Sequence, residues 1–314
     1  MKFGILAMGH GGGVPGPIPN TPVGSHGNTN FALIPDLNAN LAAFGNDFRV
    51  AEGVTLWNSA FPRRSWLPLL ERYRFWLVDC GPETALRLSG VFDEPQIPVT
   101  QNLDGVLLTH CHDDHSGGLK SLAYRAKFID GRMLDLIYPR PLHDLLTSQL
   151  AELEFLNPTA IRLDEGRDYF FHRQLLSQGP LDIHFMRPHF KGLYFPVNHN
   201  VFDREGKPFP AFGYTIRLPN GKTVTFSGDT AEPPDADVIA ASDVVIHDVQ
   251  FYANKSAVNG PQSYVHVPYK ELRDAVPREL RHKVLLTHTG HDLPPEAVVE
   301  GFRLFRGGEL LIVA

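Results

Sequence analysis

The chain has few of the features that mark secreted or membrane-spanning proteins. Only 2 of its 314 residues are cysteine, so a disulfide framework is not expected and a reducing compartment is the simpler setting. No hydrophobic run reaches transmembrane length, and the apolar stretch from Phe3 to Met8 is too short for a signal peptide. Internal repeats, low-complexity tracts and long runs of like charge are also lacking. We therefore expect a globular cytoplasmic protein without a membrane partner.

Basic side chains are not in excess either. The chain has 29 lysine and arginine residues against 35 aspartate and glutamate residues, a net charge of −6. A long polyanion is held by basic side chains that neutralise its phosphates, so a long nucleic acid is not expected as a partner. The 43% of hydrophobic residues are enough, at this length, for a sizeable core. A small-molecule substrate fits this balance better.

Residues 109–118 read Thr-His-Cys-His-Asp-Asp-His-Ser-Gly-Gly and are the most informative segment. They place His110, His112, Asp114 and His115 within six residues. Imidazoles and a carboxylate at this density repel when protonated and lose solvation when buried, and a divalent cation removes both penalties. Ligands of this kind without thiolate favour zinc, or else manganese or iron. The apolar run before the segment is predicted to be a buried strand, so these side chains lie at its carboxyl end.

The same arrangement, an apolar strand that ends at a metal-capable residue, occurs three more times. The three residues are His199, Asp229 and His288. A single histidine at a strand end is more often structural than not. Four such strand ends in one chain indicate a shared metal site with more than one ion.

Two glycine-rich motifs near the N-terminus imitate other sites. Residues 11–16, Gly-Gly-Gly-Val-Pro-Gly, satisfy the dinucleotide pattern G-x-G-x-x-G, but the prolines within and after them forbid the helix that this site needs. Residues 10–13, His-Gly-Gly-Gly, imitate an esterase oxyanion loop, but the chain has no G-x-S-x-G elbow, which excludes a serine hydrolase. We interpret the segment as a loop passing close to the metals.

The ordered motifs resemble the metallo-β-lactamase superfamily over most of the chain. The resemblance rests on Phe-Trp-Leu-Val-Asp-Cys-Gly at 75–81, the histidine cluster at 110–115, His199, Ser-Gly-Asp-Thr at 227–230 and Thr-His at 287–288. It implies an α/β fold, an αββα sandwich of two mixed β-sheets flanked by helices, with a dinuclear metal site at one edge of the sheets. It further implies one metal bound by His110, His112 and His199, a second bound by Asp114, His115 and His288, and a bridging Asp229.

The glycine-rich loop and the spacing of the expected ligands indicate which branch of the superfamily the chain resembles. The glycine-rich loop at 11–16 is similar to loops of the ribonuclease Z and cyclic-phosphodiester branches. Ribonuclease Z enzymes that mature transfer RNA insert an arm between the positions of His199 and Asp229, and here that interval is too short for one. Because the expected ligands are spread so widely, we expect a single domain over 1–314, with insertions near 36–65 and 119–198.

The chemistry that this resemblance implies is hydrolysis. Two metals about 3.5–4 Å apart can share a metal-bound hydroxide as the nucleophile and hold both the attacking and the leaving oxygen. Asp114 is predicted to orient or deprotonate the attacking water. His266 matches a histidine of ribonuclease Z-like members that resembles a leaving-group proton donor, with a capping or core histidine as the alternative. Asp248 is predicted to support the site from behind the ligands.

We therefore predict a dinuclear metal-dependent phosphodiesterase that acts on a small or cyclic nucleotide-type phosphodiester, with two divalent ions, zinc first, as cofactors. A lactone or thioester hydrolase stays open, because a metal pair also polarises a carbonyl group. A non-catalytic metal-binding scaffold is the third class. Such a scaffold would be expected to lose ligands, and this chain retains all seven.

Three segments are candidates for substrate contact. Arg187 and His189 lie in an aromatic-rich stretch that either forms a pocket wall for a base and a phosphate or packs as an edge strand. The apolar segment 36–65 is predicted either to cover the active site or to pack against a second protomer in a homodimer. The polar loop 251–260 is a candidate lid.

Overall fold

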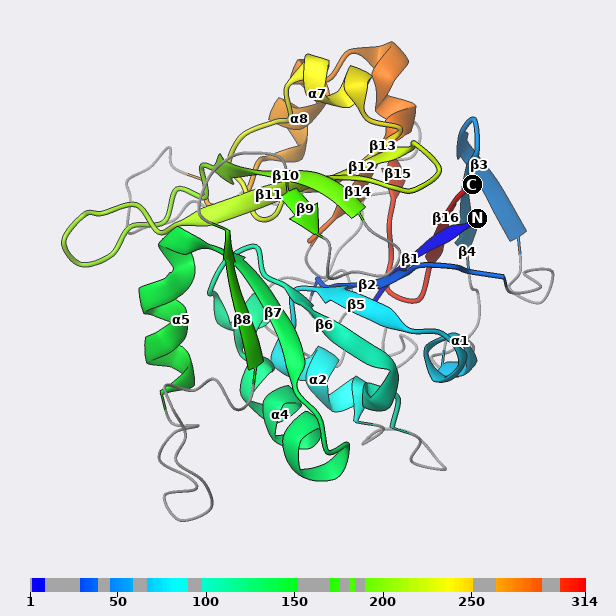
Figure 1. The fold of residues 1–314 in the computed structure, drawn as a ribbon. Helices are drawn as coiled ribbons and strands as arrows, with labels where there is room; N and C mark the ends of the chain where they lie inside the picture. The colour runs from blue at the N-terminus through cyan, green and yellow to red at the C-terminus, as the bar shows by residue number, and fades with distance from the viewer. Residues whose placement is uncertain are drawn as a thin grey trace, which may run out of the picture.

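Two β-sheets lie face to face in the computed structural model, with helices on the outer side of each sheet (Figure 1). The structure describes residues 2–8, 29–38, 46–58, 67–89, 98–151, 170–175, 181–183, 190–250, 264–289 and 300–314. Helices α7 and α8 cover one sheet, and α2 and α4 cover the other (Figure 1). The expected αββα sandwich is thereby confirmed.

The first sheet has nine strands among the described residues, in the order β3-β4-β16-β1-β2-β5-β6-β7-β8. The strands are β1 (Phe3–Ala7), β2 (Phe31–Ile34), β3 (Asn46–Ala51), β4 (Val54–Asn58), β5 (Phe75–Val78), β6 (Leu103–Leu107), β7 (Leu134–Pro139), β8 (Phe170–Leu175) and β16 (Leu310–Val313). Strands β5 to β8 run parallel, whereas the others pair antiparallel. The α-helices on this half are α1 (Leu67–Arg72), α2 (Pro82–Leu88), α3 (Asp113–Ser116), α4 (Leu119–Tyr124) and α5 (His143–Leu150). Short 3₁₀ helices lie at Thr100–Asn102 and Arg140–Leu142, and a π-helix lies at Arg125–Ile129.

The second sheet has seven strands in the described part of the chain, in the order β15-β14-β13-β12-β11-β10-β9. They are β9 (Leu181–Ile183), β10 (Phe190–Val197), β11 (Ala211–Arg217), β12 (Thr223–Phe226), β13 (Val244–Asp248), β14 (Val284–Thr287) and β15 (Arg303–Leu304). Strands β12 to β15 run parallel. The covering elements are α7 (Ala236–Ala241), α8 (Tyr269–Ala275) and a 3₁₀ turn at Arg278–Lys283.

The parallel strands of the second sheet are buried on both faces, which explains why they read as continuous hydrophobic runs. In β13, Ile246 belongs to the core between the sheets, whereas Val245 packs in the cluster beneath α7 and α8. The inter-sheet core includes Phe31, whose ring centroid lies 5.5 Å from that of Phe226 and 5.6 Å from that of Phe305. This packing fixes the spacing of the two sheets and so the distance between loops that leave them.

Parallel pairing also brings the functional loops to one edge. The loops after β5, β6, β12, β13 and β14 all leave the carboxyl ends of parallel strands. The two sheets are joined at that edge, where the Phe212 amide donates to the Thr109 carbonyl at 3.1 Å and His110 forms a β-bridge with Ala211. The metal-capable residues of both sheets therefore meet at one place.

The two segments expected to be insertions take part in the sheets. The part of 36–65 that the structure describes supplies β3 and β4, at the outer edge of the first sheet (Figure 1). Segment 119–198 supplies β7 and β8 to the first sheet and β9 and β10 to the second. The glycine-rich loop at 11–16 and the loop 251–260 lie outside the described residues. Within the described part, no helix is both long and apolar enough to span a bilayer.

Glu309, just before β16, makes stability depend on pH. Its carboxylate is only 4% exposed, and burial raises its pKa to about 7, although the Arg306 amide donates to it at 2.7 Å and lowers the pKa. In the unfolded chain a glutamate releases its proton near pH 4.3, so between about pH 4 and 7 the unfolded state binds fewer protons and stability falls as pH rises. Glu309→Gln removes this penalty and is expected to stabilise the fold by about 1–3 kcal/mol at pH 8 but not at pH 4.5. Urea unfolding at the two pH values checks this, and an equal gain at both would contradict it.

Candidate metal centre

The structure brings together all seven residues that the sequence suggested as metal ligands. They fall into two groups, in each of which the ligand atoms lie within 4.8 Å of one another. The first group is His110, His112 and His199, and the second is Asp114, His115, Asp229 and His288. The side chains come from loops after β6, β10, β12 and β14, so the site depends on both sheets.

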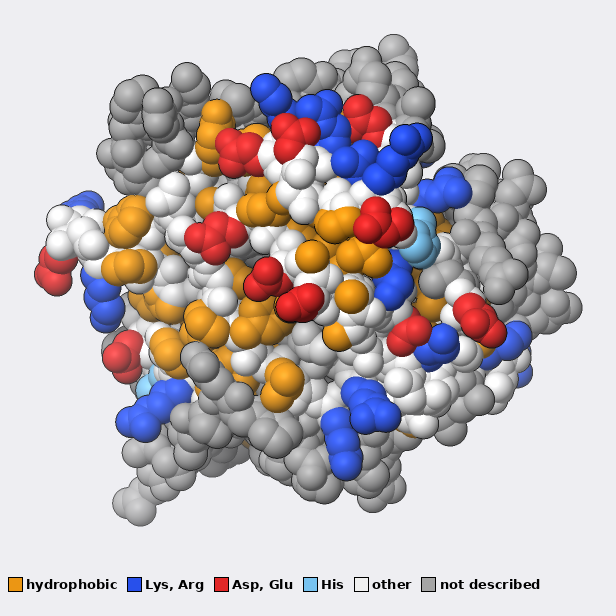
Figure 2. All heavy atoms as spheres, turned by 90° about the horizontal axis from the view of Figure 1, so that it is seen from above, with side chains coloured by type: hydrophobic (Ala, Val, Ile, Leu, Met, Phe, Trp, Pro, Cys, Tyr) orange, Lys and Arg blue, Asp and Glu red, His pale blue; other side chains and the backbone are white. Residues whose placement is uncertain are grey.

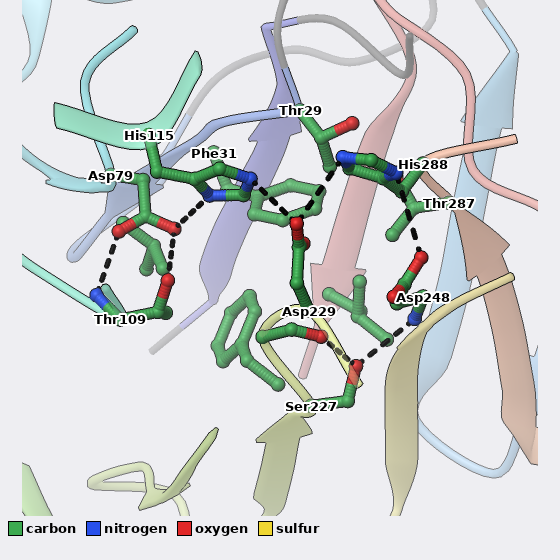
Figure 3. Close-up of a pocket in the computed structure, with 14 residues that line it drawn as sticks. Thr29, Phe31, Asp79, Thr109, His115, Ser227, Asp229, Asp248, Thr287 and His288 are labelled. Carbon is green, nitrogen blue, oxygen red and sulfur yellow. Dashed lines mark hydrogen bonds and ion pairs between the residues drawn. The ribbon is translucent and has the colours of Figure 1, made fainter. Parts of the chain in front are cut away.

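Asp229 lies between the two groups. Its Oδ2 is 3.2 Å from Nε2 of His115 and 3.5 Å from Nε2 of His288. The same oxygen is 3.6 Å from Nε2 of His110 and 4.0 Å from Nε2 of His199. Figure 3 shows the Asp229 carboxylate pointing between His115 and His288. One carboxylate oxygen thus faces imidazole nitrogens of both groups, as a bridging ligand must.

Left-handed backbone conformations present several of these side chains at strand ends. Gly228 has a φ of +63°, and a Cβ there would lie 2.5 Å from the Phe212 carbonyl oxygen, so the turn that presents Asp229 requires glycine. Asp79 and His288 also have positive φ angles, 62° and 56°, although neither is glycine. Strained non-glycine residues of this kind concentrate at functional sites, where packing holds them in place.

In the first group three imidazole nitrogens face one another. His112 Nδ1 lies 3.2 Å from His110 Nε2 and 3.0 Å from His199 Nε2. His199 Nδ1 is 3.1 Å from the Val265 carbonyl, which accepts only, so Nδ1 carries the proton and Nε2 keeps its lone pair. His110 Nδ1 is 3.0 Å from the Thr109 hydroxyl. Converging lone pairs repel unless a cation lies among them, so this donor set fits a metal ion.

In the second group His115 is held from behind by a residue that the sequence had not suggested. His115 Nδ1 lies 2.8 Å from Asp79 Oδ2, and Thr109 donates to Asp79 with its amide at 2.7 Å and its hydroxyl at 2.6 Å. His115 Nε2 is buried without a hydrogen-bond partner and lies 3.5 Å from Asp114 Oδ2. A buried nitrogen of this kind, oriented by a carboxylate on the other side of the ring, also fits a metal.

Burial and neighbouring charges shift the pKa values of several candidate ligands. Burial lowers the pKa of His110 and lowers that of His199 to about 4, so both rings are neutral, the form that binds metals. Burial would also lower the pKa of His288, but Asp229 and other carboxylates outweigh it and raise the pKa to about 9. Burial would raise the pKa of Asp229, but His115 and its neighbours hold it well below the usual range. Divalent cations would replace these protons as counterions to the carboxylates.

His266 belongs to the same site. Its Nδ1 lies 2.7 Å from Asp248 Oδ2 and 3.9 Å from Asp229 Oδ2. The Thr230 amide also donates to Asp248 Oδ2, at 2.9 Å, which fixes that carboxylate. Helix α8 begins later and has Pro268 at its N-cap, so His266 does not cap it. The His266 side chain is 16% exposed, whereas five of the seven candidate ligands are buried: His110, His115, His199, Asp229 and His288.

Cys111, the residue between His110 and His112, packs against the inter-sheet core and is part of neither group. Arg187 and His189 lie outside the described residues. Phe209 was missed by sequence reasoning: its ring stacks on His112 with centroids 4.5 Å apart and an interplanar angle of 19°. Asp79 had a usable signal, since it ends a hydrophobic strand as the predicted ligands do, whereas Phe209 had none.

Asp79→Asn is expected to weaken metal binding by about 10–100-fold, because an amide cannot hold the His115 ring and both Thr109 donors as a carboxylate does. Competition with a chromophoric chelator measures this affinity. Asp113→Asn, an exposed change at the start of α3, is the matched control. Unchanged affinity in the Asp79 variant would show that Asp79 serves folding alone.

Comparison with known proteins gives three findings. A family model described as Anti-Pycsar protein Apyc1 matches residues 68–307. The Anti-Pycsar protein Apyc1 of Bacillus phage vB_BsuM-Goe3 is 37% identical over 105 residues, which are 32% of this chain and 36% of that protein's length. Among solved structures, the metallo-β-lactamase fold protein YhfI of Bacillus subtilis is similar with a TM-score of 0.57 and 15% identity, covering 99% of both chains.

Unliganded yeast PDE1 is similar with a TM-score of 0.60 and 13% identity, covering 98% of this chain and 99% of that one. At such identities the solved structures establish the fold alone. They show that the chain has the metallo-β-lactamase fold, as the motifs indicated.

Proposed function

This chain belongs to the Anti-Pycsar protein Apyc1 family, and from this premise we propose that it is a dinuclear metal-dependent phosphodiesterase acting on small, cyclic nucleotide-type phosphodiesters. The position of Asp229 carries the proposal. One oxygen of this buried carboxylate lies within 4.0 Å of four imidazole nitrogens, drawn from both groups of candidate ligands. The His266–Asp248 pair lies beside it.

We propose that His110, His112 and His199 hold one divalent ion and that Asp114, His115 and His288 hold the other, with Asp229 shared. Imidazole and carboxylate donors without thiolate favour Zn²⁺, with Mn²⁺ or Fe²⁺ as alternatives. When bound, such a pair supplies a water activated near neutral pH and offsets the negative charge of the phosphoryl oxygens.

Two side chains then carry out the proton transfers, Asp114 for the attacking water and His266 for the leaving oxygen. Asp114 orients the attacking water and accepts its proton as the new bond to phosphorus forms. The bond from phosphorus to the leaving oxygen breaks, and His266 donates a proton to that oxygen. Asp248 accepts the hydrogen bond from Nδ1 of His266, which stabilises the protonated ring and leaves Nε2 to deliver the proton. Phe209 and the Val265 carbonyl keep His112 and His199 in place during this sequence.

A small substrate is supported by three observations. The net charge of −6 disfavours a long polyanion. The interval between β10 and β11 contains a short hairpin, with a bridge between Phe202 and Pro208, in place of a long arm. Membership of a family that degrades cyclic nucleotides favours a cyclic nucleotide among small phosphodiesters.

Turnover of bis(p-nitrophenyl) phosphate by zinc- or manganese-loaded protein is the first test, followed by a set of 3′,5′-cyclic nucleotides. Metal-dependent release that is lost in His110→Ala supports the proposal. If protein shown to carry two metals released no p-nitrophenolate, the alternative, a lactone or thioester hydrolase with the same site, would be favoured.

Further expectations about the whole protein stay proposals. A single domain over 1–314 is supported by one core cluster to which both sheets contribute. A homodimer through segment 36–65 is supported by β3, which is an edge strand of the first sheet among the described residues. Cytoplasmic location rests on composition.

A further inference from the structure

A cavity separate from the metal centre lies on the outer face of the second sheet, opposite the face that packs on the first sheet. It has a volume of about 180 Å³, somewhat more than the roughly 150 Å³ that holds a benzene ring. Its apolar wall includes Phe195, Val197, Val238 and Val245, from β10, α7 and β13. Figure 2 views the side that carries α7 and α8, where carboxylates are interspersed with hydrophobic side chains.

His247 is a buried polar residue of this cavity, as are Thr225, Ser227 and Thr230. His247 is 1% exposed, and its Nδ1 lies 2.5 Å from the Asp248 carbonyl, which accepts, so Nδ1 carries the ring proton. Its Nε2 is then an acceptor, and no hydrogen bond involves it within the described part of the chain. This nitrogen is not one of the fully buried side-chain atoms that lack a partner, so solvent or a ligand in the cavity can reach it. The cavity therefore fits a ligand that brings N–H groups.

The rim of the cavity is acidic. Glu232 and Asp235 both line it and are exposed to solvent. Glu232 Oε1 accepts from Asn198 at 3.0 Å, which orients its carboxylate, and Asp235 precedes α7 without a side-chain capping hydrogen bond. No lysine or arginine lines the cavity among the described residues. An anionic ligand is thus disfavoured, and a cation is favoured.

From these observations we propose that the cavity binds a small organic cation, an N–H-bearing amidinium, guanidinium or ammonium group attached to a compact apolar body. The apolar body packs against the valine and phenylalanine side chains. The N–H groups donate to His247 Nε2 and to the rim carboxylates. This ligand differs in charge from the phosphodiester of the metal centre, so the two sites do not compete for one molecule.

The cavity adjoins the metal centre through shared backbone. Ser227 and Thr230 line it, and both flank Asp229 in the same turn. Ser227 Oγ accepts from the Asp248 amide at 3.0 Å, and the Thr230 amide donates to the Asp248 carboxylate. A cation bound in the cavity therefore lies against the segment that positions Asp229 and Asp248.

Calorimetric titration of the full chain with benzamidinium chloride and with benzamide, its uncharged analogue, tests the proposal. At about 50 mM salt we expect benzamidinium to bind at least tenfold more tightly. Glu232→Gln and Asp235→Asn are each expected to weaken benzamidinium binding about threefold and to leave benzamide unchanged. Val238→Trp, at a side chain 37% exposed, fills the cavity and is expected to remove binding of both compounds.

Asp237→Asn, an exposed charge change on the same helix outside the cavity lining, is the control and should bind as the parent does. Equal affinity for the two compounds would overturn the cation assignment. Benzamidinium binding that persists in Val238→Trp would overturn the site itself. So would the absence of any benzamidinium binding to the parent protein at concentrations up to about 5 mM. None of these outcomes depends on phosphodiesterase activity, so the proposed function is tested separately.

Discussion

Asp229→Asn is expected to lower metal-dependent hydrolysis of bis(p-nitrophenyl) phosphate by about 10³–10⁵-fold. The change keeps the shape of the side chain but removes the charge that faces both groups of histidines. Without that negative charge, the repulsion between two neighbouring cations is no longer offset, so at least one metal ion should be lost. The metal content measured by elemental analysis should fall from two ions per chain to one or none.

The control for Asp229→Asn is Asp144→Asn, which removes an exposed carboxylate from α5. It should keep both metals and full activity. Circular dichroism separates loss of metal from loss of fold, since the inter-sheet core contains many buried side chains that the change does not touch. If the Asp229 variant kept two metals and more than about a tenth of the activity, Asp229 would not be the shared ligand.

His266→Ala is expected to lower kcat for a 3′,5′-cyclic nucleotide by about 10²–10⁴-fold, with KM little changed. We expect this loss because the leaving group is a sugar alkoxide, which needs a proton as it departs. The His266–Asp248 pair supplies that proton. p-Nitrophenolate is a stable anion that departs without a proton. The same variant should therefore lose less than about tenfold with bis(p-nitrophenyl) phosphate.

The contrast between the two substrates distinguishes proton donation from metal binding. Asp229, Asp248, His266 and His288 also lie close enough to hold an ion together, so His266 has a second conceivable role as a ligand. In that case His266→Ala would lose metal and would harm both substrates equally, which would contradict the assignment as proton donor. His282→Ala, at an exposed histidine near β14, is the matched control.

The sequence by itself determined the architecture and the set of candidate ligands. Hydrophobic strands that end at His110, Asp229 and His288 could be recognised one by one, because the pattern is local. Parallel strands place their carboxyl ends at a common edge, so local patterns were enough to predict that these residues meet. The absence of a long arm between His199 and Asp229 was equally visible in the spacing.

Only the tertiary structure decided how the side chains are held and what lies behind them. Asp79 contacts His115, Phe209 stacks on His112, and Asp248 pairs with His266, in each case across a gap that no local pattern specifies. The cavity beside His247 is formed by three strands, by α7 and by the segment before α7, parts of which are far apart in the chain. Such contacts depend on how the elements pack against one another, because a hydrogen bond or a cavity is defined by atoms within a few ångströms and not by sequence spacing.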